Sequence, residues 1–285
     1  MSVINLSSQA MIASLNISIW TARKLDKEVS KKVDAEASAL TKAGNYNKKL
    51  LPDDKMLEEI QKIASAARCS HMRMTSAWND AGGRLLTTDY FLKYKDVMSD
   101  YKRDFESAVG VFLPEYNLRI SAAAFQLGKL FNRDEYPDVS VIQNKFKFEV
   151  SYAPLPESGD FRIDITNEAV AELREQYDKK YEEGISRVMD EAWDRLYQIL
   201  LRLSNNLRVE EDGTKGRIYT STLETASELV EMLKSLNVRK DTKLEDMRQK
   251  LESALEGVSV QDIKDSDYVR SSIKQQVDDL LDKWN

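Results

Sequence analysis

Proline placement is the feature that most constrains how this chain can fold. Proline lacks the amide hydrogen that a helix interior needs, and its ring clashes with the preceding turn. All five prolines of the 285-residue chain lie before residue 157, which leaves the last 129 residues free to form long helices. We therefore expect a mainly α fold of long antiparallel helices, packed as a helical bundle or coiled coil, with one or two small β-hairpins.

The apolar pattern predicts helices along most of the chain. Apolar residues recur every three or four positions over residues 26–43, from 53 or 54 to 78, from 88 to a break at Pro114, and over 118–131. The longest pattern covers residues 166–204, where about 38 residues at a rise of 1.5 Å each would span nearly 60 Å. Such a helix either bends at Gly184 or forms half of an antiparallel coiled pair.

Sequence spacing also marks helix starts near the carboxyl end. Ser221 with Glu224, and Thr242 with Glu245, have the spacing of capping boxes, so helices are expected to begin there. A last helix is expected from about residue 267.

Alternating apolar and polar residues predict three β elements. Residues 15–20 have the period of a half-buried strand, residues 146–165 that of a β-hairpin, and residues 207–219 turn at an Asp-Gly pair as a second hairpin. These elements suggest three regions of one continuous fold. They are an N-terminal helical region with a leading strand (1–145), the first hairpin (146–165) and a long-helix region (166–285).

The composition argues against an enzyme. Neither a phosphate-binding GxxxxGK[ST] nor a GxGxxG motif occurs, and a single histidine, His71, excludes di-iron and zinc-protease ligand sets. Cys69 and His71 lie two positions apart on one helix, so their side chains cannot meet. The carboxylate row of Glu168, Glu172 and Glu175 is better explained as a solvated face. We expect no catalytic, cofactor-binding or metal-ligating residues.

Binding chemistry is favoured by the distribution of charge. The net charge is −6, but residues 1–150 hold 22 basic and 19 acidic side chains, whereas residues 151–285 hold 20 and 29. Cations gathered near the N-terminus would contact phosphates, unless they form a solvated helix face together with the interleaved acidic residues. These nucleic-acid candidates are Arg23, Lys24, Lys27, Lys31, Lys48 and Lys49.

Aromatic and methionine side chains predict a protein interface. Met189 and Trp193 fall off the main apolar stripe of the long helix, and the 146–165 hairpin has one apolar face that needs cover. The interface candidates are Phe146, Phe148, Phe161, Met189 and Trp193. No run approaches the roughly 18 apolar residues of a membrane helix, and one cysteine fits a reducing cytoplasm, so we expect a cytoplasmic protein with no membrane partner.

Three segments resemble an uncharacterised domain family of tailed phages and integrative elements. They are Leu15-Asn-Ile-Ser-Ile-Trp-Thr-Ala-Arg-Lys24, the Phe146-Lys-Phe-Glu-Val segment with Ala-Pro-Leu-Pro156, and residues 223–237 followed by Asp241 and Leu244. Members of that family are often encoded beside MoxR-type AAA+ ATPases and von Willebrand A-domain proteins. The resemblance implies a phage protein acting in the host cytoplasm, with an ATPase or another phage or host protein as partner. The family has no established activity, so the resemblance carries over no catalytic residues.

Two functional expectations follow. The first is a non-enzymatic interaction or scaffold protein that forms a homo-oligomer through its helical and hairpin surfaces. The second is an accessory DNA-binding protein of phage DNA metabolism that uses the N-terminal basic cluster.

Overall fold

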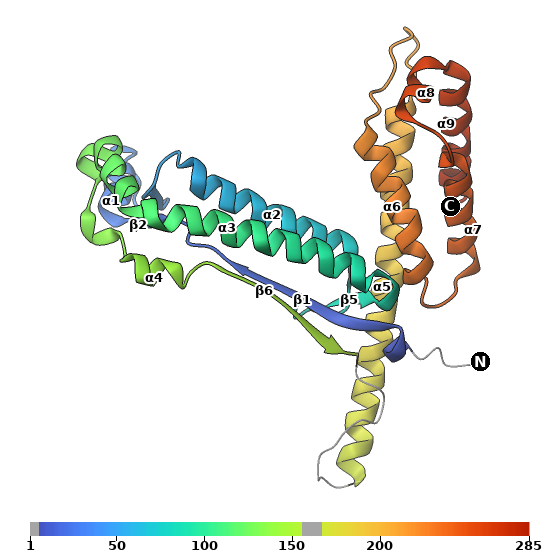
Figure 1. Cartoon of the computed structure of the whole chain (residues 1–285), viewed down its shortest axis with the longest axis horizontal. Coiled ribbons are helices and arrows are strands. Elements are labelled where there is room, and N and C mark those ends of the chain that lie inside the picture. Colours follow the sequence, from blue (N-terminus) through green and yellow to red (C-terminus); the bar gives the residue numbers. More distant parts are fainter. Residues whose placement is uncertain (1–5, 156–166, 285) are drawn as a thin grey trace. The chain divides into compact units, whose positions relative to one another are not determined.

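The structure, a computed structural model, describes residues 6–155 and 167–284, and these residues form a mainly α fold, as the sequence predicts (Figure 1). Short 3-10 turns occur at Leu6–Ser8, Gly128–Leu130 and Arg133–Glu135. The strands are β1 (Ala10–Ser18), β2 (Arg23–Asp26), β3 (Tyr46–Lys49), β4 (Ser76–Ala77), β5 (Arg84–Thr87) and β6 (Lys147–Pro154). The helices are α1 (Lys27–Glu36), α2 (Lys55–Met74), α3 (Thr88–Leu127), α4 (Val139–Gln143), α5 (Asn167–Leu207), α6 (Thr220–Leu236), α7 (Thr242–Leu255), α8 (Val260–Asp265) and α9 (Asp267–Asp282).

The chain folds as two compact units that interleave along the sequence. The bundle unit comprises Met1–Ser14, Met72–Tyr94 and Tyr152–Asn285, and the helical-hairpin unit comprises Leu15–His71 and Lys95–Ser151. The elements β1, α2, α3 and β6 each contribute residues to both units. The units are therefore discontinuous in sequence, whereas the three regions expected from the sequence follow one another.

The long helix α5 is the centre of the bundle unit. It covers nearly the range expected from the apolar pattern and packs against α6 and α9, while α7 packs against α6 and α9 as well. Leu196, Leu200 and Leu203 on α5 are fully buried. Helix α9 runs antiparallel to α5. Ser204 donates a hydrogen bond to Asp278, whereas Trp193, which is earlier in α5, contacts Trp284, which lies beyond Asp278. Of the two expectations for this helix, the antiparallel pair is the one observed.

Gly184 of α5 makes room for an aromatic ring. A Cβ atom at this position would lie 2.9 Å from the Trp78 ring, closer than any side chain tolerates. Trp78 also meets Tyr181 edge to face at 5.6 Å between ring centroids. The glycine is thus needed for close packing of α5 against Trp78.

A four-stranded sheet has the order β4-β5-β1-β6. Strand β1 pairs antiparallel with β5, with Ala10 opposite Thr87 and Ala13 opposite Arg84. The two-residue β4 and the short β5 carry too few residues for an alternation signal, which is why the sequence pattern did not indicate them. Between them Gly82 adopts a φ of +85°, and the Asn79 side chain accepts a hydrogen bond from the Gly83 amide, so this glycine pair forms a turn.

The helical-hairpin unit is built on two antiparallel helices, α2 and α3 (Figure 1). Two contacts give the relative direction of the helices. Arg119 donates a hydrogen bond to Asp54 at one end of the pair, and the hydroxyl groups of Ser70 and Tyr101 are hydrogen-bonded at the other end. Side chains of these helices and of strand β6 form an aromatic-rich core. Its buried aromatic members are Trp20, Phe105, Phe112, Tyr116, Tyr136 and Phe148.

The expected helix break at Pro114 is wrong, because α3 continues through it to Leu127. Proline at this position removes one hydrogen bond, the one that would reach the Gly110 carbonyl. Gly110 and Pro114 both face solvent, where water can satisfy that carbonyl, whereas Phe112 and Tyr116 beside them are buried. Core packing on both sides of the proline outweighs the lost bond.

The two expected capping boxes are also wrong. Helix α7 is capped one residue earlier, by Asp241, whose side chain accepts from the Lys243 and Leu244 amides, and α6 begins after Tyr219 without a side-chain cap. A capping box occurs instead at α8, between Ser259 and Asp262.

The predicted hairpins are realised in part. Strand β6 forms the first half of the 146–165 segment but pairs with β1, and residues 156–166 lie outside the described chain. In the 207–219 segment, Gly213 has a φ of +81° and one bridge joins Val209 to Lys215. Within the described residues, no helix is both long and apolar enough to cross a membrane.

Candidate functional site

The basic cluster expected from the sequence surrounds the β2–β3 ribbon in the helical-hairpin unit. The strands pair antiparallel, with Arg23 opposite Lys49 and Lys24 opposite Lys48. Asp26 ends β2 and caps α1 by accepting from the Glu28 and Val29 amides. Five of the six candidate cations are exposed: Arg23, Lys24, Lys27, Lys31 and Lys49.

Lys48 does not belong to this exposed surface, and its assignment as a nucleic-acid contact needs correction. Its side chain is 4 % exposed and donates to the Leu130 carbonyl at 2.6 Å. Its ammonium lies 2.8 Å from Glu135 and 3.5 Å from Asp26. Burial alone would lower the pKa of Lys48, but the two carboxylates outweigh it and raise that pKa. The sequence could not indicate this, because Glu135 lies 87 positions further along the chain.

A cleft of about 440 Å³ lies beside the exposed cations. Lys27, Lys31 and Lys42 line it together with Leu25 and Leu40. Leu40 is fully exposed, so this region presents both positive charge and apolar surface. Such a combination suits an anionic group attached to an apolar body.

The predicted interface residues of β6 pack inside their own chain. Phe148 is buried against Phe105, with ring centroids 5.7 Å apart, and Phe146 is half-buried against Phe112 at 5.8 Å. The free side of Phe146 lines a groove of about 550 Å³ between α3 and β6. Phe161, the third aromatic candidate of this segment, lies outside the described residues. The fold therefore uses most of this apolar face itself.

The predicted interface residues on α5 also pack inside their own chain. Met189 is buried, and Trp193 meets Trp284 of the chain end edge to face at 5.0 Å. The Lys243 ammonium lies 5.8 Å from the Trp193 ring centroid, within reach of a cation–π interaction. Intramolecular helices thus cover the edge that the sequence analysis assigned to a partner chain.

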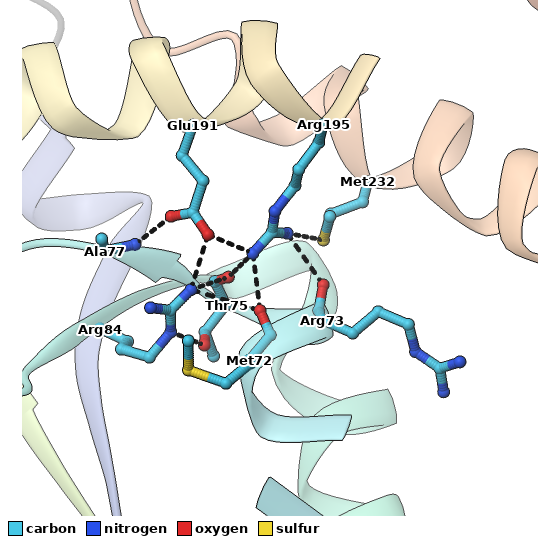
Figure 2. A network of polar contacts seen from close by, with 8 residues as sticks. All are labelled: Met72, Arg73, Thr75, Ala77, Arg84, Glu191, Arg195 and Met232. Atoms are coloured by element: carbon cyan, nitrogen blue, oxygen red, sulfur yellow. Dashed lines mark hydrogen bonds and ion pairs between the residues drawn. The ribbon is translucent and has the colours of Figure 1, made fainter. Parts of the chain in front are cut away.

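A polar network missed by the sequence analysis joins α5 to the end of α2 (Figure 2). Glu191 accepts from Arg84 at 2.9 Å and from Arg195 at 2.6 Å, and its other oxygen accepts from the Ala77 amide. Figure 2 shows both guanidinium groups turned toward carbonyl groups at the end of α2. Arg195 donates to the carbonyls of Met72, Arg73 and Thr75, and Arg84 donates to Thr75 and Met72.

These contacts give the network a structural role. The last carbonyls of a helix lack partners within it, and cations there are favourable. Burial would raise the pKa of Glu191, but the Ala77 amide and the two guanidinium groups outweigh it and lower that pKa. Glu191 is thereby held as a carboxylate between two cations. The spacing of Glu191 and Arg195 is that of an ordinary helical ion pair, and Arg84 lies 107 positions away, so no local sequence pattern marks the network.

The described residues show no grouping of three or more His, Cys, Asp or Glu side chains able to hold a metal ion. Cys69 is exposed and His71 is buried, so the two side chains lie on different sides of α2, as their spacing predicts. Glu172 and Glu175 of the carboxylate row are exposed on α5, and the Glu168 side chain lies outside the description.

Helix α3 carries an exposed apolar surface that the sequence analysis did not identify. Val111, Leu118 and Phe125 are 53 %, 68 % and 90 % exposed, and their seven-residue spacing places them on one side of the helix. We call these three residues the α3 apolar face. A search for seven-residue spacing would have found them, but the expected break at Pro114 divided the pattern.

Most of the residues around the α3 apolar face are uncharged. From Ser107 to Gln126 only Glu115 and Arg119 carry charge, although 32 % of the whole chain is charged. The Glu115 side chain is 45 % exposed, lies one turn from Val111 and from Leu118, and pairs with Arg119 at 2.8 Å. Exposed apolar surface of this kind on a helix is typical of a contact site for another helix.

The described residues thus define a mainly α protein of two units, with a basic ribbon and an apolar helix face in the same unit. No protein-family model, curated protein or solved structure matches this chain.

Proposed function

We propose that this protein is a non-enzymatic interaction or scaffold protein that binds a partner chain through the α3 apolar face. The observation that carries the proposal is the exposure of Val111, Leu118 and Phe125 on one side of α3. Full burial of a Leu or Phe side chain contributes about 1.5–3 kcal/mol, so a partner covering all three gains several kcal/mol. While they are exposed, these side chains contribute little to the stability of the fold. This favours a role in binding a partner chain.

The test is a single charge at the centre of this face. Leu118→Glu leaves the folded chain intact, because the position is exposed, and changes its stability by no more than about 0.5 kcal/mol. It places a carboxylate where a partner would bury apolar surface, so partner binding falls by about tenfold or more. Sedimentation and chemical cross-linking of the full chain in native extract measure that loss. Equal complex formation by the natural chain and by Leu118→Glu contradicts the proposal.

A second candidate function is supported by the exposed cations of β2, β3 and α1. Arg23, Lys24, Lys27, Lys31 and Lys49 would contact phosphates of single- or double-stranded DNA through a salt-dependent attraction. We expect the variant Lys24→Glu with Lys27→Glu to lose DNA retention at low salt. Lys62→Glu, an exposed lysine of α2, is the matched control and leaves retention unchanged. Failure of the natural chain to bind DNA at low salt removes this candidate.

An ATPase partner and a phage origin rest on the family resemblance alone. Co-purification with a MoxR-type ATPase, lost on Leu118→Glu, would support that partner for the α3 apolar face.

A further inference from the structure

The connection between α1 and β3, residues 37–45, is hydrogen-bonded to α1 along its length. Asp34 of α1 makes two of these bonds, because its carbonyl accepts from the Ala39 amide at 2.9 Å and its carboxylate accepts from the Ala43 amide at 3.3 Å. The Ser30 hydroxyl accepts from the Tyr46 amide at 2.9 Å, where β3 begins. Helix α1 and this connection thus form the walls of the cleft of about 440 Å³, which lies entirely within the helical-hairpin unit.

The lining of this cleft combines apolar surface with positive charge that has no counter-ion. Leu25 and Leu40 both line it, and Leu25 is 37 % exposed while Leu40 is fully exposed. Lys27, Lys31 and Lys42 line it as well. Within the part of the chain that the structure describes, none of these three lysines forms an ion pair.

The environment of these lysines differs from that of Lys48 in the same unit. The Lys48 ammonium lies beside the carboxylates of Glu135 and Asp26, which compensate its charge. Among the lining residues of the cleft only Asp34 is acidic, and its carboxylate already accepts from a backbone amide. Two of the three lining lysines also lie one helical turn apart on α1, so their like charges repel each other. A bound anion relieves that repulsion.

We propose that this cleft binds a small amphiphile with one anionic head group, a carboxylate or a phosphate, and an apolar body. The lining ammonium groups bind the head group through charge-assisted hydrogen bonds. The apolar body covers Leu25 and Leu40, and this burial favours binding. The volume of the cleft lies in the range of about 300–1,000 Å³ that is usual for sites of small molecules. The inference goes beyond the proposed function, because it does not involve the α3 apolar face.

Calorimetric titration of the full chain with octanoate and with octyl phosphate tests the class of ligand. We expect each to bind at one site, whereas 1-octanol and acetate, which have only the apolar body or only the anionic group, bind at least about tenfold more weakly. The head group that binds more tightly shows which kind of anion the cleft prefers. Equal binding of octanoate and 1-octanol overturns the inference, and so does a failure of both octyl anions to bind.

Substitutions on α1 test the location of the site. Lys27→Gln together with Lys31→Gln removes two of the lining cations, so the dissociation constant of octanoate rises by about tenfold or more. Lys32→Gln is the matched control, because Lys32 is an exposed lysine of the same helix that does not line the cleft. Circular dichroism checks that the variants keep their fold. If the control weakens octanoate binding as much as the double variant does, the cleft is not the site.

Leu40→Ser separates this site from the candidate DNA surface, which shares Lys27 and Lys31. The substitution removes apolar contact but no charge, so octanoate binding weakens by about fivefold or more while DNA retention is unchanged. Val33→Ser is the control, because Val33 is 52 % exposed on α1 and does not line the cleft, and it leaves both kinds of binding unchanged. Octanoate binding that is unaffected by Leu40→Ser contradicts the placement of the apolar body.

Discussion

Lys48 is a residue whose role depends entirely on distant partners. Its ammonium lies between two carboxylates and a carbonyl, and thereby joins the end of β2, the strand β3 and the turn at Arg133–Glu135. Exposed ion pairs contribute little, but removal of one member of a buried cluster leaves the others desolvated without a partner.

Lys48→Met should therefore destabilise the protein by about 2–4 kcal/mol. Urea denaturation followed by circular dichroism measures the change. Lys49→Met is the matched control, because Lys49 is 60 % exposed and pairs loosely with Asp53, and it should cost less than about 0.5 kcal/mol. Equal effects of the two substitutions would show that the buried cluster contributes nothing.

Glu191 makes stability depend on pH in the acid range. Its pKa is lowered in the folded chain relative to its ordinary value of 4.5. The stabilisation is therefore fully present above pH 4.5 and is lost as the pH falls through the folded pKa.

Glu191→Gln should lower the free energy of unfolding at pH 7 by about 1–3 kcal/mol, because the buried Arg84 and the partly buried Arg195 lose their counter-ion. The difference from the natural chain should shrink as the pH falls below 4.5, where the natural side chain becomes neutral too. Asp190→Asn alters the adjacent exposed carboxylate and should have no such effect. Denaturation at several pH values measures both variants; a gap that is independent of pH contradicts the role of the charge.

At the scale of elements, two glycines inside long helices have opposite roles. Gly184 of α5 lies against the Trp78 ring, whereas Gly110 of α3 has open space where a Cβ atom would lie. Helix propensity favours alanine over glycine at both positions by about 1 kcal/mol. The space around each position therefore decides whether alanine raises or lowers the stability of the protein.

Gly184→Ala should destabilise the protein by about 1–3 kcal/mol, since the added methyl overlaps an aromatic ring in the bundle unit. Gly110→Ala should stabilise it by about 0.5–1 kcal/mol. Thermal unfolding of the two variants compares them directly. If both substitutions stabilise the protein, the contact between Gly184 and Trp78 is not as close as described.

At the scale of the whole molecule, the two proposed surfaces should respond differently to salt. Phosphate contacts release counter-ions, so DNA retention by the basic ribbon should fall steeply between about 50 and 200 mM salt. Burial of the α3 apolar face against a partner is not screened by salt. Partner binding through this face should therefore change by less than about threefold over the same range, as sedimentation can measure. If DNA retention and binding through the α3 apolar face both fell steeply with salt, charge alone would drive the binding through that face.

The sequence predicts the elements better than their contacts. The mainly α class and the long 166–204 helix follow from apolar spacing, because that spacing is a local property of the chain. Pro114 shows where local rules fail, since burial of its neighbours decides whether the helix continues. The local pattern indicates a partner for Trp193, because the ring that contacts it, Trp284, lies 91 positions further along the chain.

Because the two units interleave along the sequence, they become complete at different times during synthesis. Arg84 is synthesised 107 residues before Glu191, its partner in the bundle unit. At about 5–20 residues per second, a ribosome needs roughly 5–20 s to cover that distance. During this interval the Arg84 guanidinium group lacks the Glu191 carboxylate as its counter-ion. The segments of the helical-hairpin unit, by contrast, are complete once residue 151 has emerged, so this unit can form while most of the bundle unit is still unmade.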